Sequence, residues 1–308
     1  MADETVSGAF PVVSVCVVVY NHVKYIGTCL QSLVDQESDF ALEVLVGDDC
    51  STDGSRAVIE DFAQRYPTIV KPIFREKNLG PIGNYMDTHR RAAGAYVAHM
   101  DGDDYALPGK LRKQVERMKA DPNLTILWHR VQFYNERGMR EDHPRADAPY
   151  LEVPVSRGDL MLYGPFGPHS STMYRREQFS LRYSNFDAID WLFSVELIGE
   201  GMGVMMREVL SAYLVHEHGM SGGAVANKRT RELLSGCQRE LIDRFPEYRS
   251  SIALRAAFVA VFDLAKRKRY FKDSLLVLLR TRSFPNFWLA PKLIQFFRFS
   301  KLPKRFSR

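Results

Sequence analysis

The first hundred residues alternate between short apolar runs and stretches in which apolar side chains recur at helical spacing. Residues 12–20 form a continuous run rich in β-branched side chains, which is typical of a parallel strand buried on both faces. Residues 25–34 then carry apolar side chains at helical spacing. The same alternation predicts further strands at residues 42–47, 69–74 and 95–100, with helices between them. This order predicts an α/β fold, with a Rossmann-like, mostly parallel central sheet flanked by helices.

The second half of the chain has a less regular pattern. It predicts helices at residues 111–118 and 190–198, strands at 125–133 and 209–215, and a polar loop at 135–150. From residue 227 the pattern is helical to the end, with breaks near Pro246, Pro285 and Pro291. We therefore expect an α/β domain over residues 1–225, followed by a helical extension over residues 226–308.

Polar clusters fall where three of the predicted strands end. They are Tyr20-Asn21, Asp48-Asp49 and the run from Asp101 to Asp104. Ligands of open α/β sheets bind outside the carboxyl ends of the strands, so these clusters mark the expected ligand site.

Asp101-Gly102-Asp103-Asp104 carries the strongest chemical signal of the three clusters. Carboxylates separated by one residue at a strand end can reach a hard divalent cation and the ribose of a nucleotide together. Mg²⁺ and Mn²⁺ prefer oxygen ligands and often bind one or two carboxylates plus substrate phosphates. The alternative interpretation is an acidic turn that caps the following helix, which Pro108 helps to start.

Asp48-Asp49 precedes Ser51-Thr52-Asp53-Gly54 at the end of the second strand. A carboxylate at this place can accept a hydrogen bond from the imide N–H of a pyrimidine base. The alternative is a helix N-cap by Thr52 or Asp53 with a neighbouring Asx turn. The residues alone leave both interpretations open.

Taken together, these segments resemble the inverting glycosyltransferases of family 2, which have the GT-A fold. The resemblance is dense over residues 12–135 and looser over residues 165–220. It implies a nucleotide-binding half at about 12–135 and an acceptor half at about 136–225. The segments that carry the resemblance, in chain order, are VSVCVVVYN, EVLVGDDCSTDGS, NLGPIGN and GAYVAHMDGDD.

The resemblance also implies roles for individual residues of the donor site. Tyr20 would lie against the base, Asp49 would accept from the base N3–H, and Asp101 would lie near the ribose. Asp103 would bind the metal, Mn²⁺ or Mg²⁺, which neutralises the diphosphate leaving group. The other residues implied in nucleotide-sugar binding are Val18, Asn21, Asn78, Gly80 and Asn84.

An inverting transfer also needs a general base that deprotonates the acceptor hydroxyl. The resemblance implies Asp190 for this role, with Asp187 as the second choice, although Ile189 stands where the family usually has Glu. The alternative for Asp190 is an acid favoured by the helix dipole.

The looser segment contains three further candidates. His216 is a candidate metal or phosphate ligand or else a structural histidine, and Leu214 replaces an arginine common in the family. His169 and Trp191 are candidates for lining the acceptor site.

Composition adds few constraints on the class of protein. Of the 308 residues, 45% are hydrophobic and 26% are charged, as in an ordinary globular protein with a core. The acidic start of the chain, Met1 to Glu4, does not resemble a signal peptide, and no apolar stretch is long enough to span a bilayer. The four cysteines show no C-x-x-C pair, so we expect reduced, mostly buried thiols in a cytoplasmic protein.

Charge is distributed unevenly along the chain. The segment 266–308 has 13 Lys or Arg and one acidic residue, a net charge of +12, whereas residues 1–265 carry −7. The segment also contains an aromatic helical stripe, which suits a helix lying on an anionic membrane surface from the cytoplasmic side. The alternatives are docking of this stripe on the first domain and, without a recognised motif, nucleic-acid binding, which we do not expect. The stripe consists of Leu289, Leu293, Phe296 and Phe297.

The sequence thus predicts transfer of a sugar from a UDP- or dTDP-sugar to the hydroxyl of a glycan or lipid-linked acceptor. Two alternatives remain open. A nucleotidyltransferase shares a similar sheet, but the loop after the first strand lacks the expected glycines. A non-catalytic sugar- or membrane-binding protein with a decayed site is kept open by Ile189 and Leu214.

Overall fold

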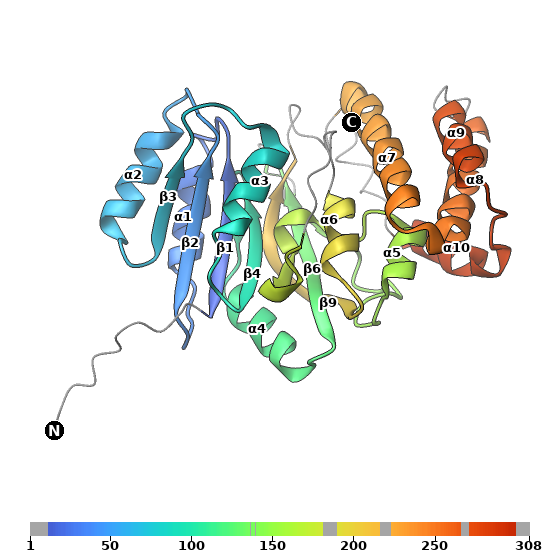
Figure 1. Cartoon of the computed structure of the whole chain (residues 1–308). Helices are drawn as coiled ribbons and strands as arrows, with labels where there is room; N and C mark the ends of the chain where they lie inside the picture. Colours follow the sequence, from blue (N-terminus) through green and yellow to red (C-terminus); the bar gives the residue numbers. More distant parts are fainter. Residues whose placement is uncertain are drawn as a thin grey trace.

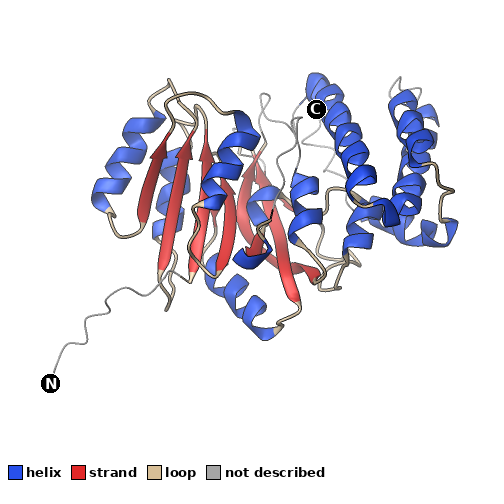
Figure 2. Cartoon of the chain, in the orientation of Figure 1, coloured by secondary structure: helices blue, strands red, loops and turns tan. Residues whose placement is uncertain are grey.

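The computed structural model describes residues 12–135, 137–138, 140–180, 190–215, 223–265 and 271–299. A nine-stranded mixed sheet runs through the centre with helices on both faces, and four further helices lie at the end remote from the N-terminus (Figures 1 and 2). The path of hydrogen-bonded strands is β3-β2-β1-β4-β8-β6-β9-β5, and β7 pairs with β6. The strands are β1 (Val13–Val19), β2 (Leu42–Asp48), β3 (Val70–Phe74), β4 (Tyr96–Asp101), β5 (Tyr105–Ala106), β6 (Leu124–Tyr134), β7 (Arg140–His143), β8 (Met173–Arg175) and β9 (Met202–Leu214).

The four strands predicted in the first hundred residues are all present, with ends within one residue of the predicted bounds. They pair in parallel, with β1 between β2 and β4. Alternate side chains of β1 enter two separate apolar layers, because successive strand residues point to opposite faces. Val13, Val15 and Val17 pack with α1 (Ile26–Val34), α2 (Ser55–Arg65) and α4 (Lys110–Ala120). Cys16 packs instead with α3 (Gly80–Arg90) and the elements of the second half.

The second half of the sheet departs further from the prediction. β9 begins at Met202, seven residues before the predicted start, and pairs in parallel with β6. β7 lies inside the predicted polar loop and pairs antiparallel with β6, so the loop prediction is wrong for Arg140–His143. Its residues are all polar or charged, so no apolar alternation marked it as a strand. β8 was also missed because it has only three residues.

The helices agree with the predicted pattern except at three places. The predicted N-cap of α2 is wrong, because Gly54 occupies that position and Asp53 Oδ1 accepts from the Ser55 N–H instead. Helix α5 was not predicted, although Ser156 and Asp159 form a capping box at its start. The helices are α1 (Ile26–Val34), α2 (Ser55–Arg65), α3 (Gly80–Arg90), α4 (Lys110–Ala120), α5 (Arg157–Tyr163), α6 (Asp190–Leu197), α7 (Gly223–Arg244), α8 (Arg249–Ala265), α9 (Phe271–Thr281) and α10 (Ala290–Phe299).

The third difference concerns the prolines of the C-terminal helices. The chain breaks near Pro246 and Pro285 as predicted, but Pro291 lies in the first turn of α10. Proline is tolerated there because the amide hydrogens of a first helical turn have no partner within the helix.

The C-terminal helices share a core with the sheet. Leu293 and Phe296 of the predicted aromatic stripe are 0% and 4% exposed, so this side of α10 docks on the first domain. The Phe296 ring stacks on Tyr163 of α5 with 4.6 Å between ring centroids. All four cysteines are unpaired and three of them are buried, as predicted. Among the described residues, no helix is both long and apolar enough to cross a membrane.

Docking of α10 can be tested by comparing two positions on that helix. Phe296→Ala removes a buried ring and should lower the free energy of unfolding by about 3–5 kcal/mol. Ile294→Ala removes a side chain that is 55% exposed and should change it by less than about 1 kcal/mol. Chemical denaturation measures both values, and equal effects would contradict the docked arrangement.

Candidate active site

The carboxyl ends of β1, β2 and β4 meet at one edge of the sheet. In the strand register Val18 lies opposite Gly47 on one side and Asp101 on the other, and Val19 lies opposite Asp48. Tyr20 follows at this edge and is 49% exposed. The structure therefore brings together the three polar clusters that the sequence places at strand ends.

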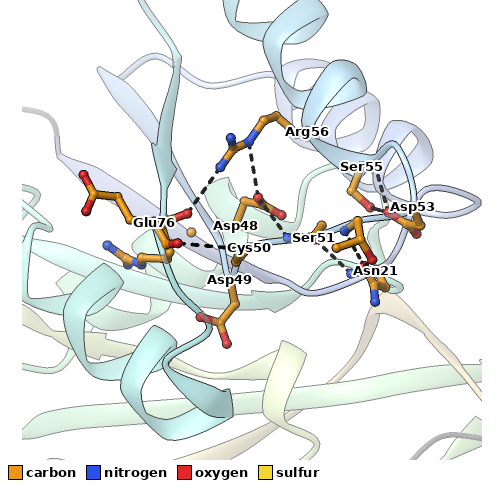
Figure 3. A network of polar contacts seen from close by, with 12 residues as sticks. Asn21, Asp48, Asp49, Cys50, Ser51, Asp53, Ser55, Arg56 and Glu76 are labelled. Carbon is orange, nitrogen blue, oxygen red and sulfur yellow. Dashed lines mark hydrogen bonds and ion pairs between the residues drawn. The ribbon is translucent and has the colours of Figure 1, made fainter.

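The loops that follow β1 and β2 are joined by hydrogen bonds, as Figure 3 shows around Asn21. The Asn21 N–H donates to the Ser51 hydroxyl at 2.9 Å, and the Asn21 side-chain oxygen accepts from the Thr52 N–H at 2.8 Å. Asn21 has a φ of 58° and Cys50 one of 65°, left-handed conformations that are uncommon outside glycine. Such conformations persist where the surroundings enforce them, often at functional sites.

Asp48 and Asp49 point in opposite directions (Figure 3). The Asp48 carboxylate is buried and lies 3.7 Å from Arg56 Nε, so it holds α2 against the strand end. The Asp49 carboxylate points toward α3, where its Oδ1 accepts from the Leu79 N–H at 2.7 Å. Burial raises the pKa of Asp49, opposed by this backbone hydrogen bond. A carboxylate has lone pairs for more than one donor, so a base N–H remains compatible with this contact.

Asn78 lies in the loop between β3 and α3, and Gly80 is the first residue of α3. Hydrogen bonds join this loop to the residue that follows β2. The Asn78 amide donates to the Asp49 carbonyl at 3.1 Å, and its oxygen accepts from the Gly80 N–H at 2.9 Å. Gly80 has a φ of 75°, which favours glycine. Both residues therefore shape the loop at the strand ends.

Asn84 lies beneath this loop and is 2% exposed. Its amide donates to the Gly47 carbonyl at 2.7 Å, and its oxygen accepts from Arg75 Nε at 3.3 Å. A side chain at Gly47 would overlap the Asn84 and Thr88 side chains, so this close approach requires glycine. The described contacts of Asn84 thus lie within the protein, where they fix the end of β2.

Asp101 and Asp103 are partly exposed, whereas Asp104 is buried. The Asp104 carboxylate accepts from the Leu214 N–H at 2.8 Å and so joins the acidic run to the end of β9. Burial lowers the pKa of the nearby Lys110 to about 7, opposed by the Asp104 charge. Lys110 Nζ donates to the Ser170 carbonyl at 2.5 Å. Asp104 and Lys110 are therefore buried residues that link the acidic strand end to β9 and to the Ser170 segment.

A buried chain of hydrogen bonds leads to the Asp101 carboxylate. Asp101 Oδ1 lies 3.1 Å from His99 Nε2, His99 Nδ1 lies 3.0 Å from His89 Nε2, and His89 Nδ1 lies 2.8 Å from the Tyr174 hydroxyl. Burial lowers the pKa of His99 to about 4 and that of His89 well below its ordinary value, so both rings are neutral.

The charge of Asp101 fixes the direction of these bonds. An ionised carboxylate only accepts, so His99 donates from Nε2 and accepts at Nδ1, His89 donates from Nε2, and Tyr174 donates to His89. Burial alone would raise the pKa of Asp101, but His99 and His169 hold it below its ordinary value. The chain therefore keeps Asp101 ionised and orients its carboxylate.

His169 and Asp190 approach Asp101 from the second half of the chain. The His169 ring stacks on His99 with centroids 3.7 Å apart, and its Nδ1 lies 4.0 Å from Asp101 Oδ2. Asp190 is the first described residue of α6 and interacts electrostatically with His169 and Asp101. Burial raises the pKa of Asp190, partly offset by His169. His169 therefore lies next to Asp101, and Asp190 interacts electrostatically with both residues.

Two other predicted residues lie differently. Trp191 is 1% exposed and its indole donates to the Leu160 carbonyl at 2.9 Å, so the ring faces the core. Leu214, at the position of the family's arginine, is 4% exposed. His216, Asp187 and Ile189 lie outside the described residues.

Two sets of side chains are candidate metal ligands. The ligand atoms of His99, Asp101 and His169 all lie within 4.8 Å of one another. Both nitrogens of His99 already take part in the buried chain, however, so a metal would have to displace one of those contacts. The partly exposed carboxylates of Asp101 and Asp103 offer hard oxygen donors and fit Mg²⁺ or Mn²⁺ better.

Sequence reasoning missed His99, His89 and Tyr174, and it did not place Ser170 against Asp101. His99 gave one usable signal, because it lies two residues before Asp101 in a strand and therefore shares its face. Ser170 Oγ accepts from the Asp101 N–H at 3.0 Å. Nothing local in the sequence places Ser170, His89 or Tyr174 beside β4.

Comparison with known proteins identifies the family. Residues 14–188 match the model of glycosyl transferase family 2, more than half of the chain. The chain therefore belongs to this family. It is 32% identical over 220 residues to an uncharacterized protein of Mycobacterium tuberculosis, a match that covers 70% of this chain and 62% of the relative. TuaG of Bacillus subtilis, named for teichuronic acid biosynthesis, is 35% identical over 108 residues, or 35% of this chain and 42% of TuaG.

Solved structures identify the fold as GT-A. Staphylococcus aureus TarS 1–349 in complex with UDP-GlcNAc matches with a TM-score of 0.60 and 21% identity, over 96% of this chain and 82% of TarS. The mannosyltransferase PcManGT of Pyrobaculum calidifontis, in complex with GDP-Man and Mn²⁺, matches with a TM-score of 0.63 and 18% identity, over 97% of this chain and 82% of the other. At these identities the likeness establishes the fold alone.

The buried histidine chain predicts a specific pH dependence of stability. The pKa of His99 is about 4 in the folded protein and about 6.5 when unfolded. The unfolded state therefore binds more protons between these values, and His99 should cost about 3 kcal/mol of stability as pH falls from 7 to 4. His99→Gln retains a donor and an acceptor but does not titrate, so it should lose less stability over this range. Denaturant unfolding at each pH measures the difference, and parallel curves would contradict it.

A second variant controls for the hydrogen bonds themselves. His99→Leu leaves Asp101 and His89 without this partner at every pH. It should lower the free energy of unfolding at pH 7.5 by about 1–3 kcal/mol relative to His99→Gln.

Proposed function

We propose that this chain is a glycosyltransferase that moves a sugar from a UDP- or dTDP-sugar to an acceptor hydroxyl, with inversion at the anomeric carbon. One observation carries the proposal: His169 from the second half lies 4.0 Å from Asp101 at the edge where β1, β2 and β4 end, and Asp190 is close enough to interact electrostatically with both. Donor-binding and acceptor-activating groups must meet around the bond that is transferred. The proximity of Asp101 and Asp190 supports this arrangement.

Asp190 is the proposed general base. Burial raises its pKa, and a more basic carboxylate is a better acceptor for the hydroxyl proton. His169 limits the rise, so that the carboxylate can be ionised near neutral pH. His169 is also proposed to contact the acceptor. Trp191 is the weaker candidate for this role, but its ring is 1% exposed and faces the core, so we do not include it.

Asp103 is the proposed direct metal ligand, with Asp101 beside the ribose and His216 as a further candidate ligand. Both carboxylates are partly exposed at the strand end, where a diphosphate can reach them. When bound, Mn²⁺ or Mg²⁺ supplies positive charge that stabilises the departing diphosphate. The Mn²⁺ in PcManGT supports a metal in this fold.

The proposed binding site for the nucleobase consists of Tyr20 and Asp49. The surrounding residues proposed to bind the nucleotide-sugar are Val18, Asn21, Asn78, Gly80 and Asn84. Asp49 as an acceptor favours the N3–H of uracil or thymine, and the UDP-GlcNAc complex of TarS supports a uridine donor. PcManGT binds GDP-Man, so the fold alone does not determine which nucleobase is bound.

We propose a glycan or lipid-linked acceptor in cell-surface polysaccharide assembly, on the cytoplasmic side of the membrane. The name of TuaG supports this. The family match argues against the nucleotidyltransferase alternative. The following experiments distinguish an active glycosyltransferase from a non-catalytic protein with a decayed site.

Donor binding should depend on the metal and on Asp103. With Mn²⁺, one pyrimidine diphosphate sugar should raise the melting temperature, and EDTA should abolish the shift. Asp103→Asn should weaken donor binding at least about tenfold, because it removes one charge facing the metal, a loss of about 1.4 kcal/mol. Asp61→Asn on α2, an exposed acid paired with Arg65, is the matched control and should bind like the parent. Calorimetry measures the affinities. Donor binding that is unchanged by removal of the metal and by Asp103→Asn would support the decayed-site alternative.

Asp190→Asn should reduce kcat by about 10²–10⁴-fold while donor binding persists, because the variant cannot take the acceptor proton. In the parent enzyme kcat should fall as pH decreases through the raised pKa of Asp190, so the acid limb should lie above the ordinary value of about 4. A pH–rate profile tests this. NMR of the new anomeric linkage tests the stereochemistry, and retention would contradict the mechanism.

A further inference from the structure

The outer face of α9 is apolar although the helix is already docked. Its inner side buries Ser274, Val277 and Thr281. On the other side Leu275, Leu276 and Leu279 are 43%, 61% and 66% exposed. These three leucines lie outside the buried core, and exposed apolar surface of this kind marks an interaction site.

The segment between α9 and α10 extends this apolar surface. Phe284 and Trp288 are each 93% exposed and Phe287 is 68% exposed. The segment is held in place, since the Asn286 N–H donates to the Ser250 carbonyl at 3.4 Å. Helix α8, which packs along α9, adds Val261 at 68% and Leu264 at 60% exposure. We name these eight residues the apolar end: Val261, Leu264, Leu275, Leu276, Leu279, Phe284, Phe287 and Trp288.

The apolar end is not the stripe that the sequence pattern marked. That stripe contains Leu293 and Phe296, which are buried against the first domain. Docking on the core and exposure to a partner therefore use different sides of the C-terminal helices, and the two are compatible.

Charge identifies the partner. Residues 271–299 contain five Lys or Arg and one acidic residue, and the exposed basic side chains Lys272 and Arg282 lie between residues of the apolar end along the chain. A second copy of this chain in a two-fold dimer would place these like charges against each other. An anionic bilayer instead attracts the basic residues while its interface accepts Trp and Phe rings.

We propose that the apolar end lies in the interface of an anionic membrane, with Phe284 and Trp288 inserted among the headgroups and Lys272 and Arg282 on lipid phosphates. Amphipathic helices with basic and aromatic side chains bind in this way at the surface of a bilayer. This proposal concerns attachment alone and does not depend on the donor or the general base.

Vesicle flotation of the full chain tests the proposal. Recovery with vesicles of phosphatidylcholine and phosphatidylglycerol should be at least tenfold higher than with phosphatidylcholine alone, and it should fall at high salt. Phe284→Ser combined with Trp288→Ser should reduce recovery at least tenfold. Because both side chains are almost fully exposed, the melting temperature should stay unchanged. Val153→Ser, at a 47% exposed position in the first domain, is the matched control and should float like the parent.

A charge variant, Lys272→Glu with Arg282→Glu, should lose the preference for anionic vesicles. Equal recovery of parent and Phe284/Trp288 variant would overturn the proposal, as would equal recovery with neutral and anionic vesicles. A parent that ignores vesicles but dimerises through these residues in analytical ultracentrifugation would assign the surface to a second copy instead. Transfer to a water-soluble acceptor, measured on the same variants, should be unchanged and separates attachment from catalysis.

Discussion

The parallel pairing of β1 with β2 on one edge and β4 on the other is the constraint on which the site depends. This register sets Val18 between Gly47 and Asp101 and places three polar strand ends side by side. It holds because β1 is buried on both faces, so a slip by one residue would exchange its two apolar layers. The loops beyond the strands are then fixed by short hydrogen bonds between Asn21, Ser51 and Thr52.

Beneath this edge the protein stabilises charges in an apolar setting. Asp101 remains ionised because neutral His99 donates to it, and His99 is in turn oriented by His89 and Tyr174. Asp104 and Lys110 form a second buried set that joins the acidic run to β9 and to the Ser170 segment. A buried charge without such partners would be strongly destabilising, so these contacts make a rigid acidic strand end compatible with folding.

The inner and outer sides of the C-terminal helices have different surroundings. Their inner sides complete the core around α5 and α6, where Arg255 of α8 lies over the ring of Trp191, the residue after Asp190. This contact helps to fix the start of α6. Their outer sides carry apolar and basic residues that the fold itself does not need. One helical segment thus packs against α6 and carries the surface that we propose for membrane attachment.

The sequence by itself determined the four parallel strands, the helical C-terminus and the polar clusters at strand ends, because these follow from the local period of apolar residues and from chain order. It also marked Asp101, Asp103 and Asp190 through their resemblance to family motifs. It did not reveal β7, whose residues are all polar, and it did not decide whether the apolar stripe of α10 meets the first domain or a membrane. Only the tertiary structure decided that His89, His99, His169, Ser170 and Tyr174 surround Asp101. Those contacts join segments far apart in the chain, and no local period records which distant residue a buried side chain will meet.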